Sequence, residues 1–411
     1  MKLLRVAPLE EAIEQLYKES VNGGLCVQTE LCPISDAGGR VLAQDVYASE
    51  DVPGFFRSTV DGVAVRSRDT GGASEGLPAF LKRTDEIEMG RAASRRLHAG
   101  ECQEISTGGM LPDGADAVVM IENTEQFTEE VIGIYEAVAS GWNTIGPSDD
   151  CRKGQRVLRA GRTLRSSDIG LCSALGIGEV SVCRPWRIAL FSTGDELVPT
   201  EQRPAPGQIR DVNSAALDAE ARRQGFSVTG CRLIADQPEL LREGVRAAMN
   251  QADFVVISGG SSKGKKDSTA QIIDELASTG AFTHGIAVRP GKPTILGFDA
   301  PTRTGLIGLP GHPVAALLLF RLIVSELWVR YTGGAREAIP HGRWGKMAVN
   351  VAASPGRKTF QLVRFREDGL VVPVLGASGL IRTMSEADGY IVLEINDEGV
   401  RADESVWVYA L

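Results

Sequence analysis

The stretch DFVVISGGSSKGKKDSTAQIIDEL (253–276) sets the fold class of this chain. Its apolar run, Phe254 to Ile257, has the length of a buried strand. Glycines, hydroxyls and three lysines come next, and helical periodicity starts near Ser268. A strand, a glycine-rich turn and a helix in this order predict one repeat of a parallel α/β sheet.

The same alternation of strand and helix runs from residue 187 to residue 332. We expect a helix at 213–225, with Asn213 as its N-cap and Gly225 at its end. Further helices are expected at 237–251, 268–279 and 312–332, and strands at 187–196 (with a loop), 227–236, 253–258, 282–288, 294–298 and 304–310. This alternation predicts a parallel sheet that is covered by helices on both faces.

The remaining segments have different patterns. Residues 9–21 show helical periodicity, 49–150 are short extended pieces broken by Gly and Pro, and 340–411 alternate like a small all-β domain. The expected fold class is therefore α/β plus β and multidomain, with a central parallel α/β domain, a β-rich inserted domain and a small β-barrel-like C-terminal domain. The expected domains are 1–48 with 151–183 (helical and linker), 49–150, 184–334 and 335–411.

The composition restricts the class of function. The chain has 411 residues, a net charge of −9 and a pI near 5.2, which argues against a general nucleic-acid-binding protein. Its seven cysteines form no CxxC pair and its four histidines lack metal-ligand spacing, so we expect reduced thiols and no zinc site. The apolar segment 314–331 carries Arg321 and Glu326, which favours a buried helix over a membrane span. We expect a cytoplasmic protein with neither membrane nor nucleic acid as a partner.

Unusual residues gather where the expected strands end, and ligands of open parallel sheets bind outside the carboxyl ends of the strands. The loops there contain glycines, hydroxyls, prolines and charged groups: Ser192, Thr193, Gly194, Asp195 and Glu196, then Asp236, then Gly259, Gly260, Ser262 and Gly264, and finally Pro310, Gly311, His312 and Pro313. We expect these loops to open onto one cleft.

Positive charge accompanies two of the turns. The glycine loop 259–267 offers converging N–H groups and three lysines to an anion such as phosphate, although it has neither the Walker nor the dinucleotide pattern. An ordinary turn with solvated lysines, in which Asp267 is a helix N-cap, is the alternative. Arg289 and Lys292 flank a rigid Pro-Gly turn, which suits an oxyanion or else is a surface turn.

Acidic residues in two regions also allow two interpretations. Asp195 and Glu196 suit Mg²⁺, which prefers oxygen ligands and substrate phosphates, or they are solvated loop acids. In the β-rich region, Asp61 before Gly62 is either a turn residue or a site acid. Thr107 belongs to another glycine turn that carries hydroxyls.

Seven stretches together resemble the molybdopterin molybdenumtransferase family, called MoeA in bacteria and represented in animals by the gephyrin E domain. They follow the family's order over most of the chain: DVPGFFRSTVDGVAVR, STGGMLPDGADAVV, FSTGDEL, GQIRDVNSAAL, SGGSSKGKKD, AVRPGKP and GLPGHPVAALLLF. Any one of these motifs is weak evidence, whereas seven in order are specific.

The resemblance implies a fold and an activity. Family members have four domains, with the molybdopterin-binding α/β domain third, and form elongated homodimers whose site lies between that domain and parts of the partner subunit. The expected function is insertion of molybdate into adenylylated molybdopterin with release of AMP, in a step that requires a divalent ion such as Mg²⁺. A molybdopterin adenylyltransferase acting upstream is an expected partner.

The resemblance also implies site residues. The expected catalytic residues are Asp61 and Thr107, reaching the cleft from the β-rich domain, Asp150 of an acidic segment, and Glu196, Asp236 and Asp267, which are also the expected Mg²⁺ ligands. The expected cofactor-binding residues are Ser192, Thr193, Gly194, Gly259, Gly260, Ser262, Gly264, Pro310, Gly311 and Pro313, the basic Arg289 and Lys292, and Arg357 and Ser378 of the last domain.

The chain departs from the family pattern in four places. The segment 145–148 replaces sequence that is often arginine-rich, Ser148 and Asp149 replace the glycine and glutamate before Asp150, His312 replaces the usual asparagine, and Ala315 replaces the usual serine. These changes motivate two alternatives. One is a non-catalytic pterin- or nucleotide-binding carrier or scaffold, and the other is a paralogue that prefers tungstate or acts on another phosphorylated cofactor. Molybdate and tungstate are similar tetrahedral dianions, so an oxyanion pocket alone does not separate them.

Overall fold

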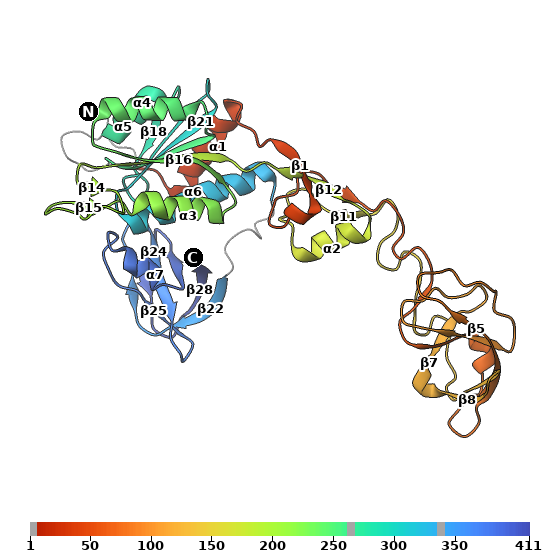
Figure 1. Cartoon of the computed structure of the whole chain (residues 1–411). Coiled ribbons are helices and arrows are strands. Elements are labelled where there is room, and N and C mark those ends of the chain that lie inside the picture. The colour runs from red at the N-terminus through yellow and green to blue at the C-terminus, as the bar shows by residue number, and fades with distance from the viewer. Residues whose placement is uncertain (1–5, 261–267, 335–341) are drawn as a thin grey trace.

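The computed structural model describes residues 6–260, 268–334 and 342–411. Figure 1 shows an elongated molecule with the α/β domain and the C-terminal β domain together at one end. The β-rich inserted domain lies at the other end, beyond a narrow region of strands and one helix. The multidomain α/β plus β fold expected from the sequence is confirmed, while the individual domain boundaries remain predictions.

The α/β domain is built on a six-stranded sheet. Its strands are, in spatial order, β16 (Ser227–Ile234), β13 (Arg187–Thr193), β17 (Phe254–Gly259), β21 (Thr304–Leu309), β20 (Ile295–Asp299) and β18 (Ala281–His284). The first four run parallel, as the alternation of strand and helix predicts. β20 and β18 run antiparallel at one side. Only residues 300–303 separate β20 from β21, too short a connection for the crossover that a parallel pair needs.

Helices cover both faces of this sheet. One face packs on α1 (Leu9–Asn22), α3 (Asn213–Arg223) and α6 (Pro313–Thr332), and the other on α4 (Pro238–Met249) and α5 (Ser268–Leu276). Strand β13 serves both layers because its side chains alternate: Ile188 and Leu190 join the first cluster, and Ala189 and Phe191 join the second.

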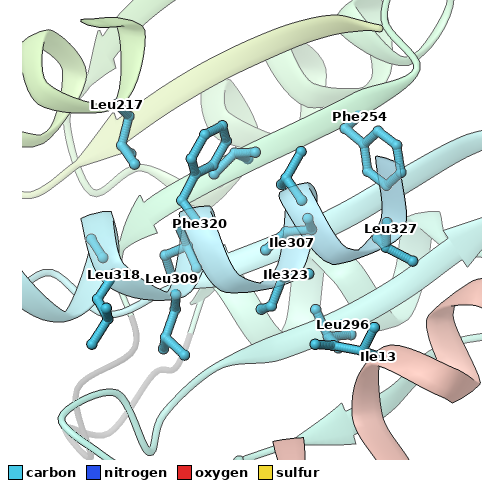
Figure 2. Packing of buried hydrophobic residues seen from close by; sticks show 14 of the residues in the cluster. Ile13, Leu217, Phe254, Leu296, Ile307, Leu309, Leu318, Phe320, Ile323 and Leu327 are labelled. Carbon is cyan, nitrogen blue, oxygen red and sulfur yellow. The ribbon is translucent and has the colours of Figure 1, made fainter. Parts of the chain in front are cut away.

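Helix α6 forms the centre of the larger core (Figure 2). Its fully buried residues Leu318, Phe320, Ile323 and Leu327 pack against side chains of the sheet, of α1 and of α3: Phe254, Leu296, Ile307, Leu309, Ile13 and Leu217. A helix that is apolar nearly all round belongs inside a protein or in a membrane. Across the described residues, no helix is long and apolar enough to span a bilayer.

The C-terminal β domain is a small closed barrel. Its strands are β22 (Gly342–Met347), β24 (Lys358–Phe365), β25 (Leu370–Pro373), β26 (Gly389–Leu393) and β28 (Ser405–Ala410), with β23 (Val351–Ala352), β27 (Gly399–Val400) and α7 (Ile381–Ser385) beside them. The barrel closes because β24 pairs with both β25 and β26. The short strand β19 (Val288–Arg289), which leaves the α/β domain, pairs in parallel with β24 and so joins the two domains.

The inserted domain and its connection complete the chain. The insert is a six-stranded sheet with the spatial order β7 (Ala117–Met120), β4 (Gly62–Val65), β6 (Glu101–Ile105), β5 (Ala79–Ile87), β9 (Val131–Ile134) and β8 (Thr124–Thr128), with β3 (Arg57–Ser58) and β10 (Thr144–Ile145) paired beside it. The connecting region contains β1 (Thr29–Pro33), β2 (Val46–Tyr47), β11 (Arg156–Leu158), α2 (Ser166–Ala174) and β12 (Glu179–Cys183).

Candidate active site

The carboxyl ends of the parallel strands lie side by side, as the sequence predicts. In the sheet register Thr193 stands next to Gly259, and Ser258 stands next to Leu309. Gly259 has φ +105°, and a Cβ atom there would lie 2.1 Å from the Thr193 carbonyl oxygen, so only glycine allows the two strand ends to approach this closely. The described parts of the loops after β13, β17 and β21 therefore share one edge of the sheet.

Asn213, at the start of α3, links these strand ends. Its side-chain nitrogen donates hydrogen bonds to Ser258 Oγ (2.6 Å) and to the carbonyl oxygen of Gly311 (2.9 Å). The expectation that Asn213 caps α3 is therefore wrong. The residue before the helix, Val212, makes no side-chain cap; Asp211 Oδ1 accepts the backbone N–H of Ser214 in the first turn at 3.1 Å, and the Asn213 side chain contacts the sheet edge.

Two oxygens at this edge have no hydrogen-bond partner among the described residues. Thr193 Oγ1 and Asn213 Oδ1 are both buried, and neither has a hydrogen-bond partner in the described part of the structure. Leaving a buried polar atom unpaired costs about 1–3 kcal/mol, which a ligand that supplies a hydrogen bond would recover. The sheet edge thus has hydrogen-bonding capacity that the described residues leave unused.

A cavity of about 550 Å³ lies beside this edge, between the α/β domain and the C-terminal barrel. Pockets of a few hundred Å³ suit small-molecule ligands. Five of the expected site residues line it: Arg289, Lys292, Pro310, Arg357 and Ser378. Among the described residues that form its wall there are three permanent cations and His312, but no carboxylate. The cavity is thus chemically suited to an anion.

The pairing of β19 with β24 brings the two arginines to one wall. Arg289 is aligned with Thr359 in the register, two residues after Arg357. Arg289 Nη1 donates a hydrogen bond to Ser354 Oγ at 2.5 Å, which orients the guanidinium against the C-terminal domain. The turn that follows packs tightly on α6, since a Cβ atom at Gly291 (φ +116°) would lie 2.2 Å from the Leu319 side chain.

Acidic residues occupy the neighbouring strand ends. Asp236 Oδ1 accepts a hydrogen bond from Ser268 Oγ (3.0 Å), and the backbone N–H of Asp236 donates to Asp195 Oδ1 (3.0 Å). The Glu196 carboxylate lies over Gly194, where a Cβ atom would be 2.8 Å from it. Within the described ranges no three His, Cys, Asp or Glu residues form a metal-binding group. Mg²⁺ commonly takes one or two carboxylates together with substrate phosphates, so the oxygen donors Glu196 and Asp236 fit that ion.

Asp61 and Thr107 form a pair in the inserted domain. The backbone N–H and the Oγ1 of Thr107 donate to Asp61 Oδ1 at 2.7 and 3.0 Å. These two hydrogen bonds, the backbone one first, lower the pKa of the Asp61 carboxyl, which is therefore ionised at neutral pH. The inserted domain lies at the other end of the molecule from the α/β and C-terminal domains (Figure 1), which form the cavity, so a single chain does not bring this pair to it.

The other expected residues vary in their placement. Asp150 is exposed, and its backbone N–H donates to the carbonyl of Val52 at 3.0 Å. Ser262, Gly264 and Asp267 lie outside the described residues, so their expected roles remain predictions. The sequence-based expectations did not include Ser258, Ser354 or the linking role of Asn213. The only signal for Ser258 was a hydroxyl at the end of an otherwise apolar run.

Family models cover most of the chain. The model "MoeA N-terminal region (domain I and II)" matches residues 7–176, "Probable molybdopterin binding domain" matches 189–328, and "MoeA C-terminal region (domain IV)" matches 345–411. The chain is 30% identical to the molybdopterin molybdenumtransferase of Haemophilus influenzae, over 93% of each protein. It is 36% identical to the molybdopterin molybdenumtransferase of a Nostoc species, over 74% of this chain and 70% of the relative.

Solved structures agree over the whole length. A crystal structure of the molybdopterin biosynthesis MoeA protein of Pyrococcus horikoshii superposes with a TM-score of 0.80 at 36% identity, covering 99% of both chains. A crystal structure of a molybdopterin biosynthesis MoeA protein of Pyrococcus horikoshii OT3 gives a TM-score of 0.84 at 27% identity, covering 99% of this chain and 100% of the other. The chain therefore belongs to the MoeA family, the family of the molybdopterin molybdenumtransferases.

Proposed function

We propose that this chain inserts molybdate into adenylylated molybdopterin and releases AMP in a Mg²⁺-dependent reaction. The observation that carries the proposal is the cavity between the α/β domain and the C-terminal barrel, with Arg289, Lys292 and Arg357 on its wall and no carboxylate among its described lining residues. Molybdate and the phosphates of the adenylylated substrate are both anions, so this lining has the charge that such a reaction needs.

The cavity and the sheet edge have complementary tasks in this proposal. The three cations hold the tetrahedral dianion, and each charge-assisted hydrogen bond contributes about 1.5–3 kcal/mol. Thr193 and Asn213, whose Oγ1 and Oδ1 atoms lack partners within the described chain, mark the sheet edge that the pterin substrate would approach. The two ligands would then lie next to each other, which is the arrangement that transfer between them requires.

Glu196 and Asp236 would hold Mg²⁺ at the neighbouring strand ends. The bound ion would offset negative charge on the phosphoanhydride oxygens. Asp236 is already oriented by Ser268 through a 3.0 Å hydrogen bond, so its carboxylate does not need to reorganise. Removal of Mg²⁺ with a chelator is expected to abolish AMP release while leaving molybdate binding intact.

We also propose that the working form is a homodimer. The inserted domain that carries the Asp61–Thr107 pair lies at the other end of the molecule from the two domains that form the cavity (Figure 1), and a second copy is the simplest way to supply the pair. All seven cysteines are free thiols, which supports a location in a reducing compartment such as the cytoplasm.

The test is AMP release by the purified full-length chain supplied with adenylylated molybdopterin, molybdate and Mg²⁺. We expect AMP to appear only when molybdate and Mg²⁺ are both present, and to be nearly lost in Arg357→Ala. Arg366→Ala is the matched control, because Arg366 lies in the same domain and outside the cavity wall. Tight binding of the substrate without AMP release would reject the proposal in favour of a carrier, and a higher rate with tungstate would identify a tungstate-preferring enzyme.

A further inference from the structure

We propose that His312 has two separable tasks: its Nδ1 atom fixes the C-terminal domain through Ser378, and its Nε2 atom donates a hydrogen bond to the oxyanion in the cavity. The identity of that anion rests on the proposed function. His312 precedes α6 at the sheet edge, whereas Ser378 lies in the C-terminal domain between β25 and α7.

The contact between the two domains is direct. His312 Nδ1 and Ser378 Oγ are 2.8 Å apart. The backbone N–H of Val314 donates to the Ser378 carbonyl oxygen at 3.1 Å, so two hydrogen bonds hold the same serine. A Cβ atom at Gly379 would lie 3.7 Å from the imidazole Cδ2 atom, which shows that the 378–379 backbone rests on the ring. His312 is thus a positioning residue for the loop that closes one side of the cavity.

The second ring nitrogen of His312, Nε2, has no hydrogen-bond partner among the described residues. Only Nδ1 of His312 has a hydrogen-bond partner there, although the residue lines the cavity together with Arg289, Lys292 and Arg357. A Ser378 hydroxyl that donates to Nδ1 leaves the proton on Nε2, because the hydrogen bond at one ring nitrogen selects the tautomer. An anion that the three cations attract favours this tautomer, and no acidic side chain of the described wall competes for the proton.

The shape of the histidine side chain explains why residue 312 can perform both tasks. An asparagine amide occupies roughly the place of Nδ1 and can still contact Ser378, but it has no atom where Nε2 lies. A glutamine amide reaches roughly the place of Nε2 but does not hold Ser378 in the same way. The asparagine common at this position in the family pattern would therefore keep the interdomain contact, and the histidine of this chain adds a donor for a tetrahedral oxyanion.

The test measures molybdate binding calorimetrically with the full-length chain, and hydrogen exchange of residues 376–380. We expect His312→Asn to weaken molybdate binding about tenfold or more, with exchange unchanged, because one hydrogen bond to a charged group is lost. His312→Gln should retain most of the affinity but raise exchange in 376–380, and Ser378→Ala should raise exchange in the same way. His98→Asn, an exposed histidine of the inserted domain, is the matched control and should change neither quantity.

Three outcomes would overturn the proposal, and they have different meanings. Unchanged molybdate affinity in His312→Asn would show that Nε2 takes no part, without affecting the proposed function. Equal losses of affinity and equal increases of exchange in both His312 variants would reduce His312 to a structural residue. Absence of any molybdate binding by the unmodified chain would overturn this inference together with the proposed oxyanion pocket.

Discussion

At the scale of single residues, the arrangement of cations has the clearest physical meaning. Arg289 is oriented by Ser354 of the C-terminal domain, and Lys292 and Arg357 line the same cavity. Like charges that share a wall without an acidic partner repel one another, and a bound dianion relieves that repulsion. We therefore expect the cationic wall to cost the ligand-free protein some stability.

Replacing one of these cations should separate stability from binding. Arg289→Ala is expected to leave the melting temperature of the ligand-free protein unchanged or slightly higher, because repulsion in the cavity falls. The same variant should bind molybdate about 10–100-fold more weakly, as expected for the loss of a charge-assisted hydrogen bond. Thermal melts with and without molybdate measure both effects, since a ligand that binds only the folded protein raises its stability by RT ln(1 + [L]/Kd), which is smaller when Kd is larger. A large loss of stability without molybdate, and equal stabilisation by it, would show that Arg289 is structural.

At the scale of elements, the start of α2 shows how one acid organises the connecting region. Asp168 is buried, and its Oδ2 accepts hydrogen bonds from Arg162 Nε and from the backbone N–H of Arg165, both at 2.9 Å. Burial by itself would raise the pKa of Asp168, but these hydrogen bonds together outweigh it and hold the pKa below its usual value. The charged form thus stabilises the first turn of the helix.

The contribution of Asp168 should depend on pH. A carboxyl whose pKa is lower in the folded state stabilises fully above its unfolded pKa of about 3.9, and the contribution is lost as the pH falls through the folded pKa. Asp168→Asn is expected to cost about 1–3 kcal/mol of local stability at pH 7, and the difference from the unmodified chain should shrink below about pH 4. Hydrogen exchange of the α2 amides at pH 7, 5 and 3.5 measures this, with exposed Asp36→Asn as control. A cost independent of pH would contradict the account.

The elements themselves were predictable from sequence because their signals are local. The apolar face of α1 and the alternation of strands and helices from 187 to 332 follow from periodicity. The antiparallel strands β18 and β20 were not predicted as such, since strand direction depends on the connections. The task of Asn213 was also missed, because a helix-start asparagine is typical of a cap and its actual partners, Ser258 and Gly311, are distant in sequence.

For the candidate site, too, the sequence predicted some features and not others. Arg289, Lys292, Arg357 and Ser378 were expected at a site, and the structure places all four on one cavity. Their convergence depends on the pairing of β19 with β24, a contact between domains that no local pattern encodes. Sequence thus identified the residue types, while the geometry required the folded chain.

At the scale of the whole molecule, the elongated shape separates two groups of expected site residues. The α/β and C-terminal domains, which form the cavity, lie at one end of the molecule, and the inserted domain, which carries the Asp61–Thr107 pair, lies at the other (Figure 1). In a symmetric dimer each site can combine the cavity of one copy with the inserted domain of its partner, and two identical sites result. A defective cavity then disables the site of its own chain, whereas a defective inserted domain disables the site on the partner.

Mixed dimers test this arrangement. Asp61→Asn and Arg289→Ala chains are each expected to be inactive in AMP release. When the two are co-expressed, about half of the dimers contain one chain of each kind, and one of their two sites has both parts intact. Activity should therefore recover to roughly a quarter of that of the unmodified protein. No recovery in mixed dimers that are shown to form would place Asp61 outside the partner's site.

The most direct measurement of the central claim is a crystal structure of the full chain with molybdate, in which anomalous scattering locates the molybdenum. The account predicts a single strong peak in the cavity between the α/β domain and the C-terminal barrel, with oxyanion oxygens about 2.7–3.2 Å from the side-chain nitrogens of Arg289, Lys292 and Arg357. A peak elsewhere on the molecule, or an empty cavity at concentrations that saturate binding in solution, would contradict it.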